Sequence, residues 1–199
     1  DDECRLGIHY QALCDQDTVI NLTNHSYFNL DGEDSESVEG QHLQIFADSF
    51  AENDAGCLPT GRIVSLDSEE GAPFDFREPT EIGKRLHEEN IHLKNGSGYD
   101  HNYLLKKQPD GLCARAYSRS SGILLECRTS EPGMQLYTGN FLSTSNIVGK
   151  GGKSYADRAG FCLETQHYPN AMEHPEFPSV VLPAGELYDT PTEYHISLL

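Results

Sequence analysis

The sequence predicts an all-β protein folded as an antiparallel β-sandwich, and three observations lead to this prediction. Short runs rich in Val, Ile, Leu, Tyr and Phe are separated by Gly, Pro, Asn and Asp, as strands are separated by turns. These runs follow closely on one another, without the alternating helical segments that indicate a parallel sheet. The 199 residues contain no repeat and no long linker, so residues 1–199 are expected to form a single domain.

The expected strands of the N-terminal half are bounded by turn residues, because each has Gly, Pro, Asn or Asp within three residues of one end. Two acidic segments rich in Ser and Gly, at 31–40 and 67–71, are expected to be surface loops beside these strands. One short segment, Glu81–Glu89, resembles a helix. In chain order, the strands expected here are Leu6–Leu13, Val19–Thr23, His42–Ala47 and Gly61–Leu66.

The C-terminal half contains more strands of the same kind and no segment that resembles a helix. Gly, Pro and Ser again mark their ends. In chain order, these strands are Asn102–Lys106, Leu112–Tyr117, Gly122–Thr129, Met134–Thr138, Gly160–Thr165, Ser179–Leu182 and Tyr194–Leu199.

Charge narrows the classes of partner. The chain has 14 basic and 32 acidic residues and a formal net charge of −18. Such a surface repels phosphate groups, so no nucleic acid or anionic membrane is expected as a partner, and a phosphorylated substrate is disfavoured. No run of 18 apolar residues is present, so no membrane span is predicted. A neutral small molecule is the simplest ligand.

Cysteine and histidine patterns give no sign of a metal or cofactor. The six cysteines include no Cys-x-x-Cys pair, and His87 and His92 are five residues apart rather than the four of zinc proteases. No phosphate-binding loop, dinucleotide fingerprint or nucleophile elbow is present. The acidic N-terminus lacks the apolar stretch of a signal peptide, so we expect reduced thiols and a cytoplasmic location.

The first candidate site residue, His25, lies in the segment Asn-Leu-Thr-Asn-His-Ser-Tyr-Phe-Asn-Leu at 21–30. If the second half of this segment is extended, His25 shares one face with Tyr27 and Asn29, and that face could hold a ligand. A histidine is a good proton donor near neutrality, because its ordinary pKa is about 6.5. A solvent-facing strand with an ordinary His is the alternative interpretation.

Asp100, Gln135 and Tyr137 are candidates for binding a polar molecule. Asp100 follows a Gly-rich stretch at 95–98, and its carboxylate could accept hydrogen bonds from a substrate hydroxyl or from its own backbone in a turn. On a strand, Gln135 and Tyr137 share a face. An amide beside an aromatic ring is a natural sugar contact, although a half-exposed strand would look the same.

Glu164 is the most informative residue, because a carboxylate in an apolar strand is costly unless it has a function or a partner. It shares a face with Cys162 and Gln166, while its neighbours on the chain point the opposite way. Burial should raise its pKa and make it a better base near neutrality. A structural ion pair is the alternative, which the small number of cations disfavours.

Taken together, several segments resemble the aldose 1-epimerase (galactose mutarotase) family. They occur in order along nearly the whole chain and are Asn21–Leu30, Pro59–Gly61, Pro73–Arg77, Gly98–Tyr103, Glu131–Leu142 and Gly160–Pro183. The resemblance implies a large antiparallel β-supersandwich and a cofactor-free enzyme that interconverts the α and β anomers of galactose and glucose. It also implies that Glu164 is the general base, that His25 is the general acid, and that Asp100 and Gln135 bind sugar hydroxyls.

One departure from the family concerns the N-terminal side. Members carry a long portion with a substrate-binding Arg in an Asn-Arg motif and a second His near His-Gly-Gly, and neither motif occurs here. The chain is therefore expected to be the C-terminal part of an epimerase. Exposed strand edges would invite association, so we expect a monomer or a weak homodimer.

Three other functions stay open at this point. A sugar-binding or regulatory fragment without turnover would also keep the pocket. A glycoside hydrolase could use Asp100 and Glu164 as its carboxylate pair, but this would leave His25 without a role. A sugar-phosphate epimerase has similar chemistry, and the scarcity of cations disfavours it.

Overall fold

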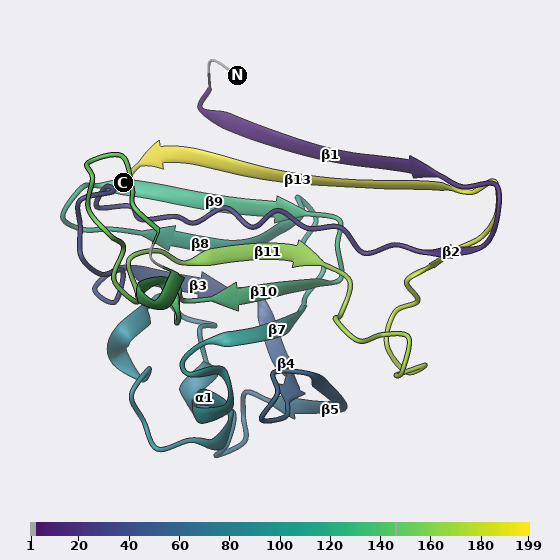
Figure 1. The fold of residues 1–199 in the computed structure, drawn as a ribbon, viewed down its shortest axis with the longest axis horizontal. Helices are drawn as coiled ribbons and strands as arrows, with labels where there is room; N and C mark the ends of the chain where they lie inside the picture. The colour runs from purple at the N-terminus through teal and green to yellow at the C-terminus, as the bar shows by residue number, and fades with distance from the viewer. Residues whose placement is uncertain (1–2, 146) are drawn as a thin grey trace.

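The computed structural model describes residues 3–145 and 147–199, and nearly all of its regular structure is β (Figure 1). Its strands form a six-stranded sheet in the order β1-β13-β9-β8-β3-β6, a five-stranded sheet in the order β11-β10-β7-β4-β5, and the two-stranded pair β12-β2. Every strand pair in these sheets is antiparallel. The predicted all-β, antiparallel class is confirmed.

The strands of the larger sheet are β1 (Arg5–Leu13), β3 (His42–Ile45), β6 (Thr80–Glu81), β8 (Leu112–Tyr117), β9 (Ile123–Thr129) and β13 (Leu187–Leu198). Those of the second sheet are β4 (Ala47–Asn53), β5 (Pro59–Ser65), β7 (Asp100–Leu105), β10 (Gly133–Tyr137) and β11 (Cys162–Gln166). The short pair is β2 (Thr18–Val19) and β12 (Val181–Leu182). The 3-10 turns are Ala72–Phe74, Ile82–Lys84 and Leu142–Ser145, and the one α-helix in the described residues is α1 (Ile91–Gly96).

The helix predicted at Glu81–Glu89 is wrong. Only a single 3-10 turn forms there, and the backbone N–H of Leu86 then donates to Gly83, three residues earlier, as in a turn and not four residues earlier as in an α-helix. The helix α1 lies just beyond. It begins where the side chain of Asn90 accepts hydrogen bonds from the first N–H groups of the helix, as an N-cap does.

The strand predicted at Val19–Thr23 is reduced to β2, and β6 was not predicted. Two other differences from the predicted strands have identifiable reasons. Strand β4 was missed because its Ala, Ser, Asp and Asn residues are poor strand formers, yet it is held between β5 and β7. Strand β13 begins earlier than predicted and runs through Pro191. That is possible because Pro191 lies beyond the end of β9 and pairs with β1 alone, so no hydrogen bond to β9 is lost.

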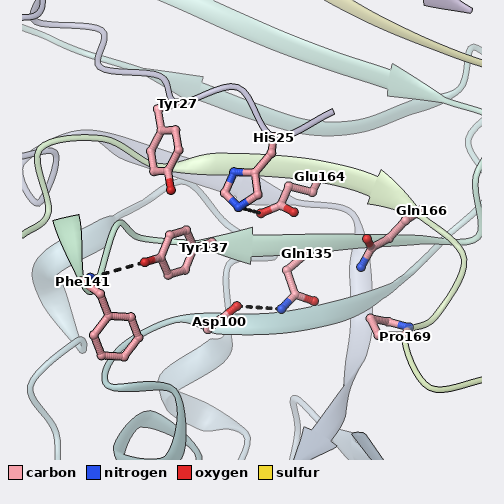
Figure 2. Close-up of a pocket in the computed structure, with 9 residues that line it drawn as sticks. All are labelled: His25, Tyr27, Asp100, Gln135, Tyr137, Phe141, Glu164, Gln166 and Pro169. Carbon is pink, nitrogen blue, oxygen red and sulfur yellow. Dashed lines mark hydrogen bonds and ion pairs between the residues drawn. The ribbon is translucent and has the colours of Figure 1, made fainter. Parts of the chain in front are cut away.

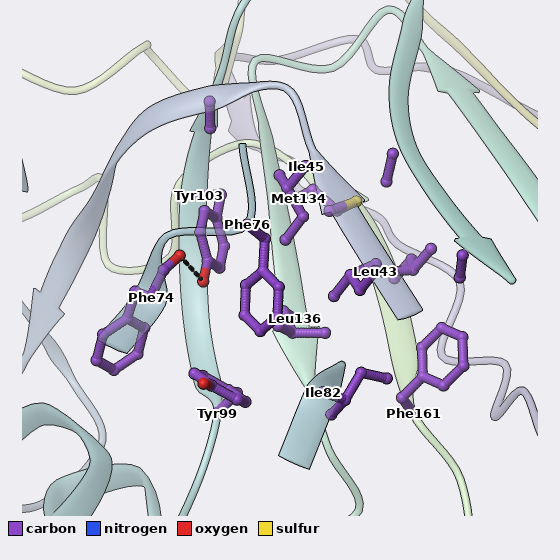
Figure 3. Close-up of a cluster of buried hydrophobic side chains, with 14 of the residues drawn as sticks. Leu43, Ile45, Phe74, Phe76, Ile82, Tyr99, Tyr103, Met134, Leu136 and Phe161 are labelled. Atoms are coloured by element: carbon purple, nitrogen blue, oxygen red, sulfur yellow. Dashed lines mark hydrogen bonds between the residues drawn. The ribbon is translucent and has the colours of Figure 1, made fainter. Parts of the chain in front are cut away.

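The core lies between the two large sheets. It packs against one face of the five-stranded sheet, and the candidate site lies on the other face. The buried apolar residues of the core come from both sheets, with Leu43 and Ile45 on β3 and Met134 and Leu136 on β10 (Figure 3). The hydroxyl of the fully buried Tyr103 donates a hydrogen bond of 2.9 Å to the backbone carbonyl of Phe74. A rigid core of this kind holds β7 and β10 in fixed register.

The longest helix in the described part of the chain has six residues, so no helix there could span a bilayer.

Candidate active site

The site is built on three neighbouring strands of the five-stranded sheet. In the register of this sheet, Asp100 on β7 lies opposite Tyr137 on β10, and Gln135 on β10 lies opposite Glu164 on β11. Because alternate residues of a strand point to opposite faces, these four side chains emerge on one face and the core residues on the other. Figure 2 shows them converging from β7, β10 and β11.

His25 reaches this group from an irregular segment that is tied to both ends of β11. At one end, Phe28 and Phe161 exchange two backbone hydrogen bonds of 2.8 and 2.9 Å. At the other end, the amide of Asn21 donates to the carbonyl of His167 and accepts from its N–H, both at 3.0 Å. These two attachments place His25 over the middle of β11.

His25 and Glu164 form the central pair of the site. The Nε2 atom of His25 lies 3.4 Å from Oε1 of Glu164, and its Nδ1 atom lies 3.3 Å from the thiol of Cys162. The His25 side chain is 51% exposed, whereas that of Glu164 is only 10% exposed. A solvent-accessible imidazole therefore faces a largely buried carboxylate, as an acid and base working on one ligand would.

Burial makes Glu164 a base suited to neutral pH. Desolvation, with a smaller contribution from the Asp100 carboxylate, raises the pKa of Glu164 from 4.5 to about 7. The pKa of Asp100 is also raised by burial, although the hydrogen bond from Gln135 and the proximity of His25 oppose the rise. A carboxylate with a pKa near the ambient pH can both accept and return a proton.

A hydrogen bond joins the side chains of Gln135 and Asp100. The Nε2 atom of Gln135 donates to Oδ1 of Asp100 at 2.7 Å. The Oε1 atom of Gln135 is buried and has no hydrogen-bond partner among the described residues. This pair fixes the orientation of the amide and leaves an unused acceptor beside Glu164.

Two tyrosines form an aromatic wall around His25. The Tyr27 ring stacks on the His25 ring at a centroid distance of 5.1 Å, and Tyr137 meets it edge-on at 5.9 Å. The Tyr137 hydroxyl accepts a hydrogen bond from the backbone N–H of Phe141 at 3.3 Å. Flat aromatic surfaces next to hydrogen-bonding groups are typical of sites that hold a ring with one apolar face.

These residues enclose a pocket of about 350 Å³, which is within the range of small-molecule sites. It is lined by His25, Tyr27, Asp100, Gln135, Tyr137, Phe141, Glu164, Gln166 and Pro169. None of these described lining residues is Lys or Arg.

The structure brings together all five candidate site residues predicted from the sequence, and Tyr27 lies with His25 as predicted. Asn29 does not reach the pocket, because its amide donates to backbone carbonyls of Ser35 and Ala159. Phe141 and Pro169 were missed, since each lies in a turn after its strand and no sequence pattern marks it as a lining residue.

One group of side chains in the site has the composition of a metal centre. One ligand atom each from His25, Cys162 and Glu164 lies within 4.8 Å of the other two. No motif spacing marks this group, because Cys162 and His25 are 137 residues apart along the chain.

Comparison with known proteins identifies the family to which this chain belongs. The sequence pattern of the aldose 1-epimerase family matches residues 1–195. The chain belongs to the aldose 1-epimerase family. It is 43% identical over 194 residues to galactose mutarotase from Bos taurus, a match that covers 97% of this chain and 54% of that protein. It is 38% identical over 197 residues to aldose 1-epimerase from Escherichia coli, covering 97% and 55%.

Solved structures of epimerases agree with this assignment. An aldose epimerase homologue from C. elegans superposes with a TM-score of 0.86 at 31% identity, covering all of this chain and 57% of that one. Galactose 1-epimerase from Lactobacillus acidophilus superposes with a TM-score of 0.82 at 25% identity, covering 100% and 55%. The chain thus spans about half the length of the relatives that it matches.

Proposed function

We propose that this chain carries the acid and base of an aldose 1-epimerase and interconverts the α and β anomers of free aldohexoses such as galactose and glucose. The observation that carries the proposal is the pair of His25 and Glu164, whose Nε2 and Oε1 atoms lie 3.4 Å apart at the wall of a sugar-sized pocket. Relatives named galactose mutarotase and aldose 1-epimerase support it.

The proposed reaction needs one proton removed and one delivered at neighbouring oxygens. Glu164 takes the proton of the C1 hydroxyl while His25 gives a proton to the ring oxygen. The bond between C1 and the ring oxygen then breaks, which leaves an aldehyde at C1 and a hydroxyl on C5. Rotation about the C1–C2 bond exposes the other face of the aldehyde, and closure returns both protons. Each group can contribute about 10²–10⁴-fold to the rate.

Asp100, Gln135 and Tyr137 are proposed to hold the sugar. The Asp100 carboxylate can accept from hydroxyls, and Gln135 has an unused acceptor beside Glu164. Tyr137, with Tyr27, can pack against the C–H face of the ring. The absence of Lys and Arg among the described lining residues supports a neutral sugar over a sugar phosphate.

Residues 1–199 are proposed to belong to one epimerase domain, because buried residues of both large sheets form a single core. We further propose a cytoplasmic location, which the six free cysteines support, since free thiols persist in reducing compartments. A monomer or weak homodimer is proposed because β1 forms an edge of the larger sheet (Figure 1).

The test is polarimetry on freshly dissolved α-D-galactose and α-D-glucose. The chain is expected to bring the optical rotation to its equilibrium value faster than buffer alone, and heat-denatured protein is the control. If galactose binds in calorimetry but the rotation changes no faster than in buffer, the chain is a sugar-binding fragment and not an epimerase.

A further inference from the structure

Two side chains on one face of β11, together with His25 above them, have chemistry that exceeds what epimerisation requires. Cys162 and Glu164 lie two residues apart on β11, so they share a face of the strand, and each contacts the imidazole of His25. The proposed reaction uses the carboxylate and the imidazole but has no step for a thiol. Thiol, imidazole and carboxylate are, however, the three side-chain types that bind Zn²⁺ in proteins.

The spacing of these donors is close to that of a tetrahedral site. The Cys162 sulfur is 3.3 Å from His25 Nδ1, and a Glu164 oxygen is 3.4 Å from His25 Nε2. Ligand atoms around Zn²⁺, at bond lengths of about 2.0–2.3 Å, are themselves about 3.3–3.8 Å apart. One atom from each residue lies within 4.8 Å of the others, so the set needs to contract by roughly 1 Å.

His25 is the ligand that can supply this adjustment. The Cys162 thiol faces Nδ1 of His25, whereas the Glu164 carboxylate faces Nε2. To bind one ion together with both of them, the His25 ring must turn so that a single nitrogen points at the ion. The His25 side chain is half exposed and lies on an irregular segment, whereas Cys162 and Glu164 are buried on a paired strand. Two fixed ligands and one movable ligand can close on an ion that enters from the open pocket.

The charge around the group favours a cation. Besides Glu164, the Asp100 carboxylate lines the same pocket. No Lys or Arg is found among the described residues that line the pocket, so His25 is the basic side chain there that can compensate these carboxylates. The chain as a whole carries a formal charge of −18, which attracts cations from solution.

We propose that His25, Cys162 and Glu164 bind a thiophilic divalent cation such as Zn²⁺, with a fourth position open to the pocket. On binding, the Cys162 thiol loses its proton to solvent, since a coordinated sulfur is a thiolate. The ion occupies the lone pairs of the proposed acid and base and so inhibits the reaction. This inhibition rests on the proposed function, whereas the binding does not.

Titration of the full chain with Co²⁺, in excess Mg²⁺ to cover surface carboxylates, tests the binding. We expect one Co²⁺ per chain and a thiolate-to-cobalt charge-transfer absorption, both displaced by Zn²⁺. Cys162→Ser should abolish the absorption and Glu164→Gln should weaken Co²⁺ binding at least ~10-fold. Cys14→Ser, at the end of β1, is the matched control and should bind as the unsubstituted chain does.

Two results would overturn the proposal. One is the absence of a charge-transfer absorption in the unsubstituted chain, and the other is an unchanged absorption in Cys162→Ser. Circular dichroism of each variant shows whether it is folded, and Glu164→Gln provides a second reading if Cys162→Ser is not. Because no sugar is present, these outcomes are independent of epimerase activity. In the active chain, Zn²⁺ should slow mutarotation and a chelator should restore it.

Discussion

Asp100→Asn should shift the pH dependence of the reaction, because Asp100 is one of two causes of the raised pKa of Glu164. That pKa rises from 4.5 to about 7, with burial as the larger cause and the Asp100 carboxylate as the smaller. The rise is about 2.5 pH units and Asp100 supplies less than half of it. Removing its charge should therefore lower the pKa of Glu164 by less than about 1.2 pH units, so that Glu164 stays ionised to lower pH.

The sign follows from the role of the base, which acts only when ionised. In the unsubstituted chain, kcat/KM for α-galactose should fall about tenfold for each pH unit below about 7, since kcat/KM reports the free enzyme. In Asp100→Asn the fall should begin at lower pH, whatever the variant does to the absolute rate. Polarimetry from about pH 5 to 8, with a chelator present, measures both profiles.

Asp110→Asn is the matched control, because this carboxylate lines a different pocket. Its profile should coincide with that of the unsubstituted chain. An acid limb in Asp100→Asn that stays in place, or that moves to higher pH, would refute the assignment of Glu164 as a base whose pKa Asp100 raises.

Three further predictions concern stability, each measured by urea unfolding. Burial lowers the pKa of His101 from 6.5 to about 3, so the stability that its neutral form contributes is present above pH 6.5 and is lost as the pH falls toward 3. The free energy of unfolding should therefore fall by about 1.4 kcal/mol per pH unit in this range. His101→Phe should lose this pH dependence, and an unchanged dependence would contradict the reasoning. Phe50→Ala should cost about 3–5 kcal/mol, since the ring is fully buried, and a loss under 1 kcal/mol would count against the core described here. Gly133→Ala should lower the free energy of unfolding by about 1–3 kcal/mol, because the added Cβ would lie 2.8 Å from the side-chain amide of Asn102. Gly40→Ala is the control and should leave stability unchanged, because its Cβ would meet nothing within 4 Å. Equal losses in the two variants would contradict the close packing at Gly133.

The local parts of the site could be predicted from the sequence. Strand alternation placed Glu164 with Cys162, and Gln135 with Tyr137, because alternation depends only on neighbouring residues. The apolar residues around Glu164 correctly indicated that this strand is buried. Because burying a carboxylate is costly, they also marked Glu164 as a candidate site residue. The family resemblance then supplied the association of Glu164 with His25.

The long-range parts could not be predicted from local pattern. The register that sets Gln135 opposite Glu164 depends on pairing across strands far apart in the chain, and so does the contact of Cys162 with His25. Strand β4 lacks strand-forming residues and exists because its neighbours pair with it. The helix begins ten residues later than predicted, at Ile91, where the side chain of Asn90 caps its first N–H groups.

The central claim is that Glu164 and His25 act as base and acid on a bound sugar. The most direct measurement is the rate of α-galactose mutarotation by Glu164→Gln, with galactose binding measured on the same sample. Gln has nearly the same shape but cannot accept the proton, so we expect the rate to fall at least ~100-fold while galactose still binds. A Glu164→Gln chain that binds galactose and keeps its full rate would contradict the account.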